Sequence, residues 1–192
     1  MTKEFITSWD DGGQFDTSLA TLNKRFNIPA IFYIPTNCEL SKKQIRSLAI
    51  DFEIGGHTTH HYELTRMCSE NILYEIKENR DYLRNLTGQD VHSFCYPKGY
   101  YNKDVIANVK LAGYREARTV KRLNTETPKN KFEIETTIHA YPNHKEQGRW
   151  LEKAKEIWDT DPDYFHLWGH SAELQKYSLW DELEEFYKYI ND

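Results

Sequence analysis

The chain has 192 residues, enough for one domain of ordinary size, and a chain of this length buries roughly 70% of the surface that its unfolded form exposes. The hydrophobic content of 39% and the aromatic content of 14%, with nine Gly and six Pro, are typical of a folded globular protein and exclude disorder over most of the chain. With 25 Lys and Arg against 30 Asp and Glu, the net charge of -5 gives no general attraction to a polyanion, so nucleic acid is not an expected partner. We expect a single domain over residues 1–192.

The sequence predicts neither a membrane-spanning protein nor a disulfide-stabilised one. The longest apolar run, residues 30–34, is far shorter than the ~20 residues that span a bilayer. The N-terminus has no hydrophobic stretch of signal-peptide length, so the default expectation is a cytoplasmic protein. Cys38, Cys68 and Cys95 are widely spaced without a Cys-x-x-Cys pair, which argues against a disulfide framework and a Cys-based zinc site. We expect all three to be buried as small hydrophobic side chains.

Short apolar stretches alternate along the chain with longer segments of helical period. A repeating order of strand and helix, with crossovers of this length, favours parallel strands in a barrel or in an open doubly wound sheet. The predicted strands lie, in chain order, near residues 4–9, 30–35, 52–56, 92–96, 115–120, 133–138 and 164–168.

The helices are predicted from the spacing of apolar residues and from capping signals. Phe15, Leu19, Leu22 and Phe26 are spaced by four, three and four residues, which places them on one face of the first helix. The other predicted helices follow in order: one that begins with the capping-box spacing of Ser41 and Gln44, one from Ile72 to Leu86 that Gly88 ends, one from Val105 to Ala112, one over residues 145–159, and one from Leu179 to Ile190.

In either architecture a ligand site lies at the carboxyl ends of the strands. The residues that follow the predicted strands are unusually polar. They are Asp10 and Asp11 after the first strand, His57, His60 and His61 after the third, Lys98 after the fourth, and His170 after the last. Carboxylates and imidazoles that converge on one rim are what a metal-dependent hydrolase needs.

Two histidines and two aspartates on this rim have spacings that suggest roles. His57 and His61 are four residues apart, which would point both imidazoles at one cation if the segment formed a helical turn, and a carboxylate would complete three ligands. His60 is an alternative second ligand on geometry alone. Asp10 and Asp11 are consecutive and would point to opposite sides of an extended chain, so one can be a ligand and the other a base, or one can cap the following helix.

The chain resembles the NodB-homology polysaccharide deacetylases, family four of the carbohydrate esterases, in four motifs. Residues 7–12, Thr-Ser-Trp-Asp-Asp-Gly, are similar to the family's Thr-Phe-Asp-Asp-Gly motif, and residues 57–61 match its His-[Ser/Thr]-x-x-His motif in full. Residues 95–99, Cys-Tyr-Pro-Lys-Gly, stand where the family has Arg-x-Pro-[Tyr/Phe]-Gly, and residues 167–170 resemble the late motif that supplies a catalytic His. The resemblance implies an α/β fold, a distorted (β/α) barrel of about seven parallel strands.

The same resemblance implies removal of N-acetyl groups from an aminosugar or glycan with a divalent metal, zinc being the first expectation. A metal of this kind activates water and polarises the amide carbonyl. The roles that the resemblance implies are metal ligation by Asp11, His57 and His61, which favours His61 over His60, general base for Asp10, general acid for His170, and oxyanion donor for the backbone N–H of Lys98.

The chain departs from the family pattern in two places. Cys95 replaces the motif Arg, whose charge would tune the catalytic Asp, and Arg118 at the end of the predicted fifth strand is a candidate to supply that charge to Asp10. The alternative for Arg118 is a surface salt bridge. No copy of the family's Asp-x-x-Asp-Trp motif is recognisable, so the wall of the acetyl pocket is unassigned.

Several residues beside the motifs are candidates for substrate contact: Trp9, Tyr96, Pro97, Tyr100 and Trp168. The alternative for each of the aromatic rings is packing in the core. Four further histidines have no recognisable partner and are expected at ordinary core or surface positions: His92, His139, His144 and His166.

Two other functions compete with deacetylation. One keeps the fold and opens cyclic amides, as relatives of the allantoinase-like branch do. The other is a non-catalytic carbohydrate-binding protein that retains the metal triad for stability. The presence of both Asp10 and His170, which a bare metal site does not require, argues against the second alternative.

Overall fold

A computed structural model describes residues 4–191. Seven strands form one sheet with the order β5-β4-β3-β2-β1-β7-β6, and every neighbouring pair is parallel. The strands are β1 (Glu4–Asp10), β2 (Ala30–Ile34), β3 (Glu53–Gly56), β4 (Ser93–Cys95), β5 (Glu116–Arg118), β6 (Ile138–His139) and β7 (Tyr164–Gly169). All their carboxyl ends therefore lie at the same edge of the sheet.

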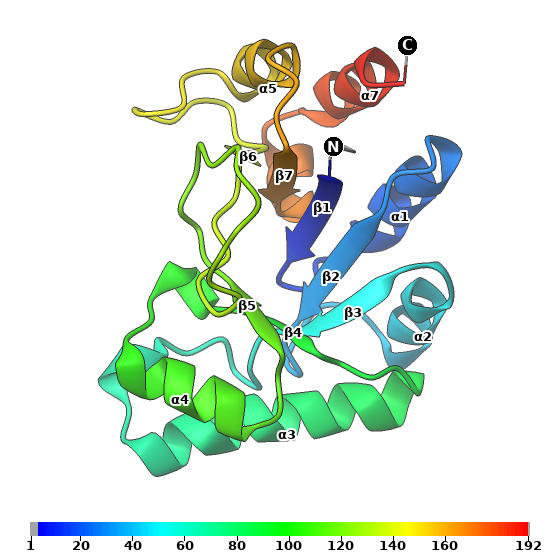
Figure 1. Cartoon of the computed structure of the whole chain (residues 1–192). Coiled ribbons are helices and arrows are strands. Elements are labelled where there is room, and N and C mark those ends of the chain that lie inside the picture. The colour runs from blue at the N-terminus through cyan, green and yellow to red at the C-terminus, as the bar shows by residue number, and fades with distance from the viewer. Residues whose placement is uncertain (1–3, 192) are drawn as a thin grey trace.

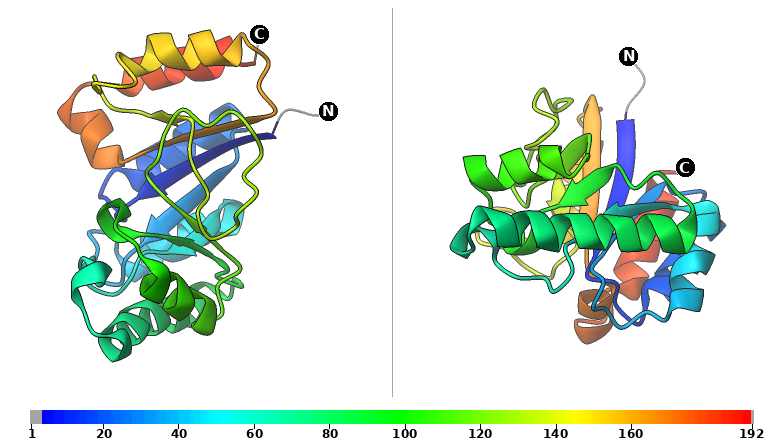
Figure 2. Two further views of the ribbon diagram at one scale, coloured as in Figure 1. Left: turned by 60° about the vertical axis from the view of Figure 1, so that its left-hand side comes forward. Right: turned by 90° about the horizontal axis from the view of Figure 1, so that it is seen from below.

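The sheet curls into a half-barrel, with helices along its convex side (Figures 1 and 2). The helices are α1 (Asp16–Arg25), α2 (Lys42–Asp51), α3 (Ser69–Thr87), α4 (Lys103–Leu111), α5 (Trp150–Trp158), α6 (Ser171–Lys176) and α7 (Trp180–Tyr189), with short 3-10 turns η1 (Leu64–Arg66) and η2 (Pro97–Gly99). The predicted fold class, a distorted barrel of about seven parallel strands, is confirmed.

The two edge strands of the sheet, β5 and β6, are joined by an irregular segment that lies across the open side of the curl (Figure 1). Thr119 N donates to the carbonyl of Ile134 at 2.8 Å, and Thr137 N donates to the carbonyl of His166 at 2.9 Å. The predicted strand over 133–138 is wrong for most of its length, because only Ile138 and His139 join the sheet. Ile134 forms only an isolated parallel bridge with Arg118 of β5, and Thr136 and Thr137 bond through their hydroxyls to the carbonyls of Lys121 and Asn124.

Local signals account for several helix ends. Ser41 and Gln44 form the capping box that begins α2, and Gly88 ends α3 in the left-handed region at φ 75°. The helix expected over 145–159 begins only at Trp150, because His144 and Gly148 exchange two backbone hydrogen bonds in a tight turn. The short helix α6 was not expected from the sequence.

Side chains of β1 alternate between two environments, as the period of a strand requires. Trp9 packs in the main apolar core, whereas Ile6 packs inside the curl with Tyr33 and Cys95. The interior also holds polar pairs, such as Ser8 Oγ with His166 Nε2 at 2.7 Å. Asp10 shares the parity of Ile6 and Ser8, so this alternation directs it to the interior at the carboxyl end of β1.

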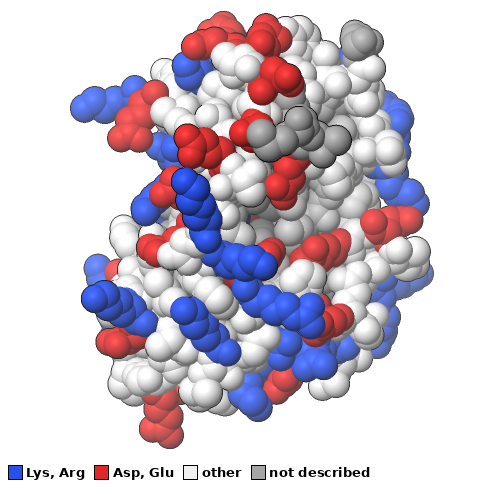
Figure 3. Space-filling model, in the orientation of Figure 1, with Lys and Arg blue, Asp and Glu red and all other residues white. Residues whose placement is uncertain are grey.

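The cysteines differ in environment. Cys95 is buried and Cys38 is half-buried, but Cys68 is exposed, so the expectation of burial is wrong for Cys68. Within residues 4–191 no helix has the length and apolar character needed to cross a bilayer. On the face shown in Figure 3, Lys and Arg side chains are interspersed with Asp and Glu, as the small net charge leads one to expect.

Replacing Gly88 by Ala should destabilise the protein by about 1 kcal/mol. A Cβ at this position would contact nothing within 4 Å, so the cost comes from the left-handed backbone alone. The measurement is the free energy of unfolding in urea. The exposed Asn85→Ala on the same helix is the control and should not destabilise. Equal stability of Gly88→Ala and the native chain would contradict the assigned helix end.

Candidate functional site

The ends of β1 and β3 bring one carboxylate and two imidazoles together. Asp11 Oδ1 lies 3.3 Å from His57 Nε2 and 3.3 Å from His61 Nε2. Two ligands bound to one zinc ion at about 2.0–2.1 Å in a tetrahedral arrangement are about 3.3–3.4 Å apart, longer than the usual N–H···O hydrogen bond. These two separations, in a group whose ligand atoms all lie within 4.8 Å of one another, therefore fit a divalent ion.

The segment from His57 to His61 is a loop and not the helical turn that its spacing suggested. Thr58 and His61 have positive φ values of 67° and 58°. Conformations of this kind cost on the order of 1–3 kcal/mol for non-glycine residues. The bend brings His61 to Asp11, whereas His60 Nδ1 donates to Glu75 on α3 at 2.6 Å. His61, and not His60, thus completes the cluster.

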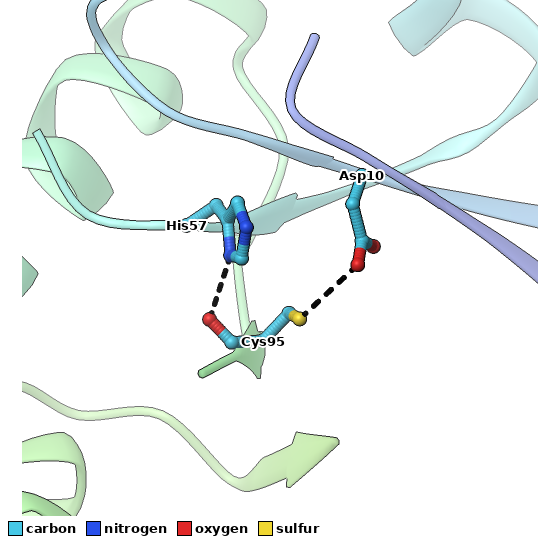
Figure 4. Close-up of side chains that lie close together, drawn as sticks. All are labelled: Asp10, His57 and Cys95. Atoms are coloured by element: carbon cyan, nitrogen blue, oxygen red, sulfur yellow. Dashed lines mark hydrogen bonds between the residues drawn. The ribbon is translucent and has the colours of Figure 1, made fainter. Parts of the chain in front are cut away.

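The imidazole of His57 is held in one orientation. It is 2% exposed, and its Nδ1 donates to the carbonyl of Cys95 at 2.8 Å (Figure 4). Because Nδ1 carries the proton of this hydrogen bond, the neutral ring presents its lone pair at Nε2, on the side of Asp11. Metal-ligating histidines are usually oriented by a partner of this kind.

The charges of the cluster favour a cation. Burial alone would raise the pKa of Asp11, but the contact with His57 and the charges of His57, His170 and His61 hold this pKa well below its usual range. Burial alone would lower the pKa of His57, yet Cys95, Asp11 and Asp10 raise it well above its ordinary value. Burial and the neighbouring His57 lower the pKa of His61. The negative potential around His57 is therefore strong enough to favour positive charge in a buried position.

Asp10 is buried beside Asp11 and forms an ion pair with Arg118 of β5. A single guanidinium nitrogen of Arg118 contacts both carboxylate oxygens of Asp10, and the same nitrogen lies 2.8 Å from Cys95 Sγ. Cys95 Sγ in turn lies 3.6 Å from Asp10 Oδ2 (Figure 4). Arg118 is fully buried, so the alternative of a surface salt bridge is wrong. The guanidinium lies where it can replace the charge that Cys95 does not carry.

The two aspartates face different surroundings because the chain turns between them. Asp10 is the last residue of β1, whereas Asp11 has a φ of 77° and a side chain that is 46% exposed. Neither of them caps the next helix, since α1 begins at Asp16 with Phe15 at its N-cap position. One carboxylate is therefore enclosed and the other is open to solvent.

His170 lies on the same rim and is oriented by Glu173, which the sequence interpretation missed. Its Nε2 is 3.7 Å from Asp11 Oδ2, and its Nδ1 donates to Glu173 Oε2 at 2.6 Å. Burial would lower the pKa of His170, but Glu173 and Asp10 raise it above its ordinary value. Burial would raise the pKa of Glu173, but hydrogen bonds from His139 and His170 lower it to about 2.

His139 also belongs to this cluster, although no partner was expected for it. Its Nε2 donates to Glu173 Oε2 at 3.0 Å, its ring stacks on Trp168, and burial lowers its pKa to about 4. His139 directly follows the predicted strand over 133–138 and stands at the end of β6, so the rule of strand ends could have identified it. Glu173 follows His170 by three residues, a spacing that becomes informative only once α6 is known.

Most of the residues proposed for substrate contact are buried. Trp9 and Tyr96 pack in the main core, and the Tyr96 hydroxyl donates to the carbonyl of Phe132. Pro97 is buried in η2, and Trp168 is 5% exposed beneath His139. The expectation of substrate contact is wrong for these four, because their rings fill the interior. Tyr100 is 52% exposed beside η2 and stays a candidate.

Lys98 occupies the turn that follows β4. It has a positive φ of 57° inside η2, directly after Pro97, and its side chain is exposed. Its charge is one of the influences that lower the pKa of His61, after burial and the charge of His57. The Lys98 side chain therefore lies near enough to the cluster to act on it electrostatically.

Comparisons with known proteins give the family and the fold of the chain. The family described as polysaccharide deacetylase matches residues 2–117. A search of curated proteins finds no match. Among solved structures the chain is similar to the Streptococcus pyogenes deacetylase PplD in complex with acetate, with 19% identity over 68% of this chain and 62% of that chain and a TM-score of 0.61.

Two further structures are similar over nearly the whole chain. The Xyl-CE4 domain of a multidomain xylanase from the hindgut metagenome of Trinervitermes trinervoides has 15% identity over 99% of this chain and 81% of that chain, with a TM-score of 0.64. A CE4 family pseudoenzyme from Bacillus anthracis has 13% identity over 98% of this chain and 62% of that chain, with a TM-score of 0.67. At these identities the likeness concerns the fold, and the chain spans less than two thirds of the first and third proteins.

Proposed function

Because the chain belongs to the polysaccharide deacetylase family, we propose that it is a metal-dependent hydrolase that removes N-acetyl groups from an aminosugar or glycan. The proposal rests on the groups that meet on one rim. Three residues of the kinds that bind metals lie beside a buried carboxylate, which is paired with an arginine, and beside a histidine, which is paired with a glutamate. This combination supplies the groups that metal-assisted hydrolysis of an amide needs.

Asp11, His57 and His61 would hold the divalent ion, with zinc as the first candidate. The spacing of their ligand atoms and the orientation of His57 by the Cys95 carbonyl support this assignment. A divalent ion at this position supplies Lewis acidity toward the amide carbonyl and lowers the pKa of bound water.

Asp10 would act as the general base. It is enclosed by Arg118 and Cys95, and the guanidinium of Arg118 is its counter-ion. The ionised carboxylate would accept the proton of the attacking water as the new C–O bond forms.

His170 would act as the general acid and protonate the leaving amine as the C–N bond breaks. Glu173 accepts a hydrogen bond from Nδ1–H of His170, so the ring presents Nε2 to the rim. The negative charge of Glu173 stabilises an imidazolium. The backbone N–H of Lys98 would donate to the developing oxyanion. This role does not depend on the side chain at position 98.

The alternative of a non-catalytic carbohydrate-binding protein is less favoured by these contacts. Holding a metal or a sugar does not require the buried pair of Asp10 and Arg118 or the pair of His170 and Glu173. Burial of charge is costly, and an arrangement that offsets it at two reacting positions fits acid–base chemistry. The cyclic-amide alternative uses similar groups and is decided by the substrate test.

The test measures divalent metal content together with acetate release from N-acetylated sugars and short glycans, with allantoin as the cyclic amide. We expect one equivalent of metal and acetate release that a chelator abolishes and zinc restores. Ring opening of allantoin without acetate release would support the cyclic-amide alternative. A metal-loaded protein that turns over none of these substrates and still binds glycans would support the non-catalytic one.

Replacing Asp11, His57 or His61 by Ala should abolish binding of one metal equivalent, because three protein ligands leave no spare. The His60→Ala variant is the matched control and should keep the metal, since His60 points to Glu75. Elemental analysis after gel filtration gives the content. Unchanged metal in the first three variants, or loss in His60→Ala, would overturn the ligand assignment.

Replacing Asp10 by Asn should leave metal binding intact and slow turnover at least about a hundredfold, because the amide cannot accept the proton. Since this change leaves the buried Arg118 without its counter-charge, the variant is also made in an Arg118→Met background and compared with Arg118→Met alone. Turnover close to the parent rate in both backgrounds would show that another group is the base.

Replacing Arg118 by Met should move the acidic limb of the kcat/KM pH profile to higher pH. The guanidinium contacts both carboxylate oxygens of Asp10, so the replacement removes the positive charge nearest to the proposed base. Adding Cys95→Arg to this variant should move the limb back down. An acidic limb that stays in place in Arg118→Met, with normal metal content, would assign Arg118 a structural role alone.

A further inference from the structure

Two buried polar side chains of α3 lie against the loop that carries His57 and His61. Glu75 accepts hydrogen bonds at Oε2 from the backbone N–H groups of Thr59 and His60, at 3.1 and 2.9 Å, and at Oε1 from His60 Nδ1 at 2.6 Å. The carboxylate thereby contacts two consecutive peptide groups in the middle of the loop, and the backbone carbonyl of Glu75 also accepts from Thr59 N at 3.1 Å.

Asn79, one turn further along α3, fixes the beginning of the same loop. Its Oδ1 accepts from the backbone N–H of His57 at 2.9 Å, and its Nδ2 donates to the carbonyl of Ile34 at 3.0 Å and to Thr36 Oγ1 at 3.1 Å. This side chain joins the ends of β2 and β3 to the helix.

The face of α3 that carries these residues is otherwise apolar. Glu75 is 3% exposed and Asn79 is fully buried, and they lie among the buried Ile72, Ile76 and Leu83. Burying a carboxylate and an amide in such a face is unfavourable unless all their hydrogen-bonding groups are paired. Here nearly all of their partners belong to the loop or to the strand end beside it.

The loop needs external support because its own conformation is unfavourable. Thr58 is β-branched and has a positive φ, which is rare for such a residue, and His61 has one as well. Within the loop His61 N donates to Thr58 Oγ1, while the carbonyls of Thr58 and Thr59 accept from residues 36 and 37. Helix α3 therefore supplies the partners for the backbone N–H groups of His57, Thr59 and His60.

We propose that Glu75 and Asn79 are positioning residues that hold this loop in its metal-binding conformation and thereby set the affinity for the ion. The inference rests on the proposed function, because it takes Asp11, His57 and His61 as the ligands. A loop that is already bent loses little freedom when the ion arrives, so part of the affinity comes from α3.

The experiment titrates the metal-free protein with Co²⁺, follows the visible absorption bands of the bound ion, and repeats the titration with Zn²⁺ against a chromophoric chelator. Glu75→Gln and Asn79→Ala should each bind about 10–100-fold more weakly than the native chain, with altered Co²⁺ bands. Glu78→Gln is the matched control, since it removes an exposed carboxylate from the same helix and should bind normally.

A second control separates positioning from general stability. Ile76→Val removes a buried methyl group between the two positions, so it should lower the unfolding temperature and leave the metal affinity unchanged. Circular dichroism shows which variants are folded. If Asn79→Ala is not folded, the result for Glu75→Gln decides the outcome. Folded Glu75→Gln with native affinity and native Co²⁺ bands overturns the inference. The proposed function is overturned instead if the native chain binds no ion, or if Asp11→Ala does not abolish the binding of the ion.

Discussion

The buried ion pair between Arg118 and Asp10 connects distant parts of the curled sheet. Arg118 lies on the edge strand β5 and Asp10 at the end of the inner strand β1, so the pair crosses the concave side. Removing charges from water costs several kcal/mol for each ion, which only close geometry and further hydrogen bonds offset. Arg118 also donates to Cys95 Sγ and to the carbonyl of Thr119, whereas its buried Nε has no hydrogen-bond partner among the described residues. Because strand pairing does not extend from β5 to β6, this interior contact helps to fix the curl on which the rim depends.

The same pair explains how two consecutive carboxylates come to differ. Asp10 continues the strand and meets a permanent cation in the interior, whereas Asp11 turns outward in the left-handed region and meets imidazoles. Carboxylates with different surroundings can take different chemical roles at one pH. The difference between the two carboxylates comes from the main chain, because the backbone is extended at Asp10 and has a positive φ at the next residue, Asp11.

The sequence was sufficient for the sheet and for the motifs, and it failed where tertiary contacts decide. Alternating strand and helix patterns predicted parallel strands, with the strand over 133–138 wrong for most of its length, and the rule of strand ends brought Asp10, Asp11, His57 and His170 to one rim. Glu173 could not be predicted because α6 is a single short helix without an apolar period.

Two other outcomes follow from packing. Glu75 and Asn79 look like ordinary polar residues of a long helix, and only the path of the His57 loop shows what they bind. Trp9 was wrongly expected at the substrate, although strand alternation already places it on the side of the sheet opposite to Asp10. For this residue the periodicity was a better guide than its position beside a motif.

The exposure of the cluster indicates the side from which a substrate would approach in the proposed reaction. Asp11, His61 and His170 keep part of their surface open to solvent, while His57 and Asp10 are enclosed. An amide that reaches the ligand atoms must therefore come from the side of His61 and His170, with Asp10 on the interior side. In the proposed reaction His170 would stand on the side of the entering group, where it could protonate the leaving amine, and Asp10 would accept the proton of the attacking water from the enclosed side. With Trp9, Tyr96 and Trp168 buried, recognition of a sugar ring would depend on polar groups of the rim and on Tyr100, more than on a stack of aromatic rings.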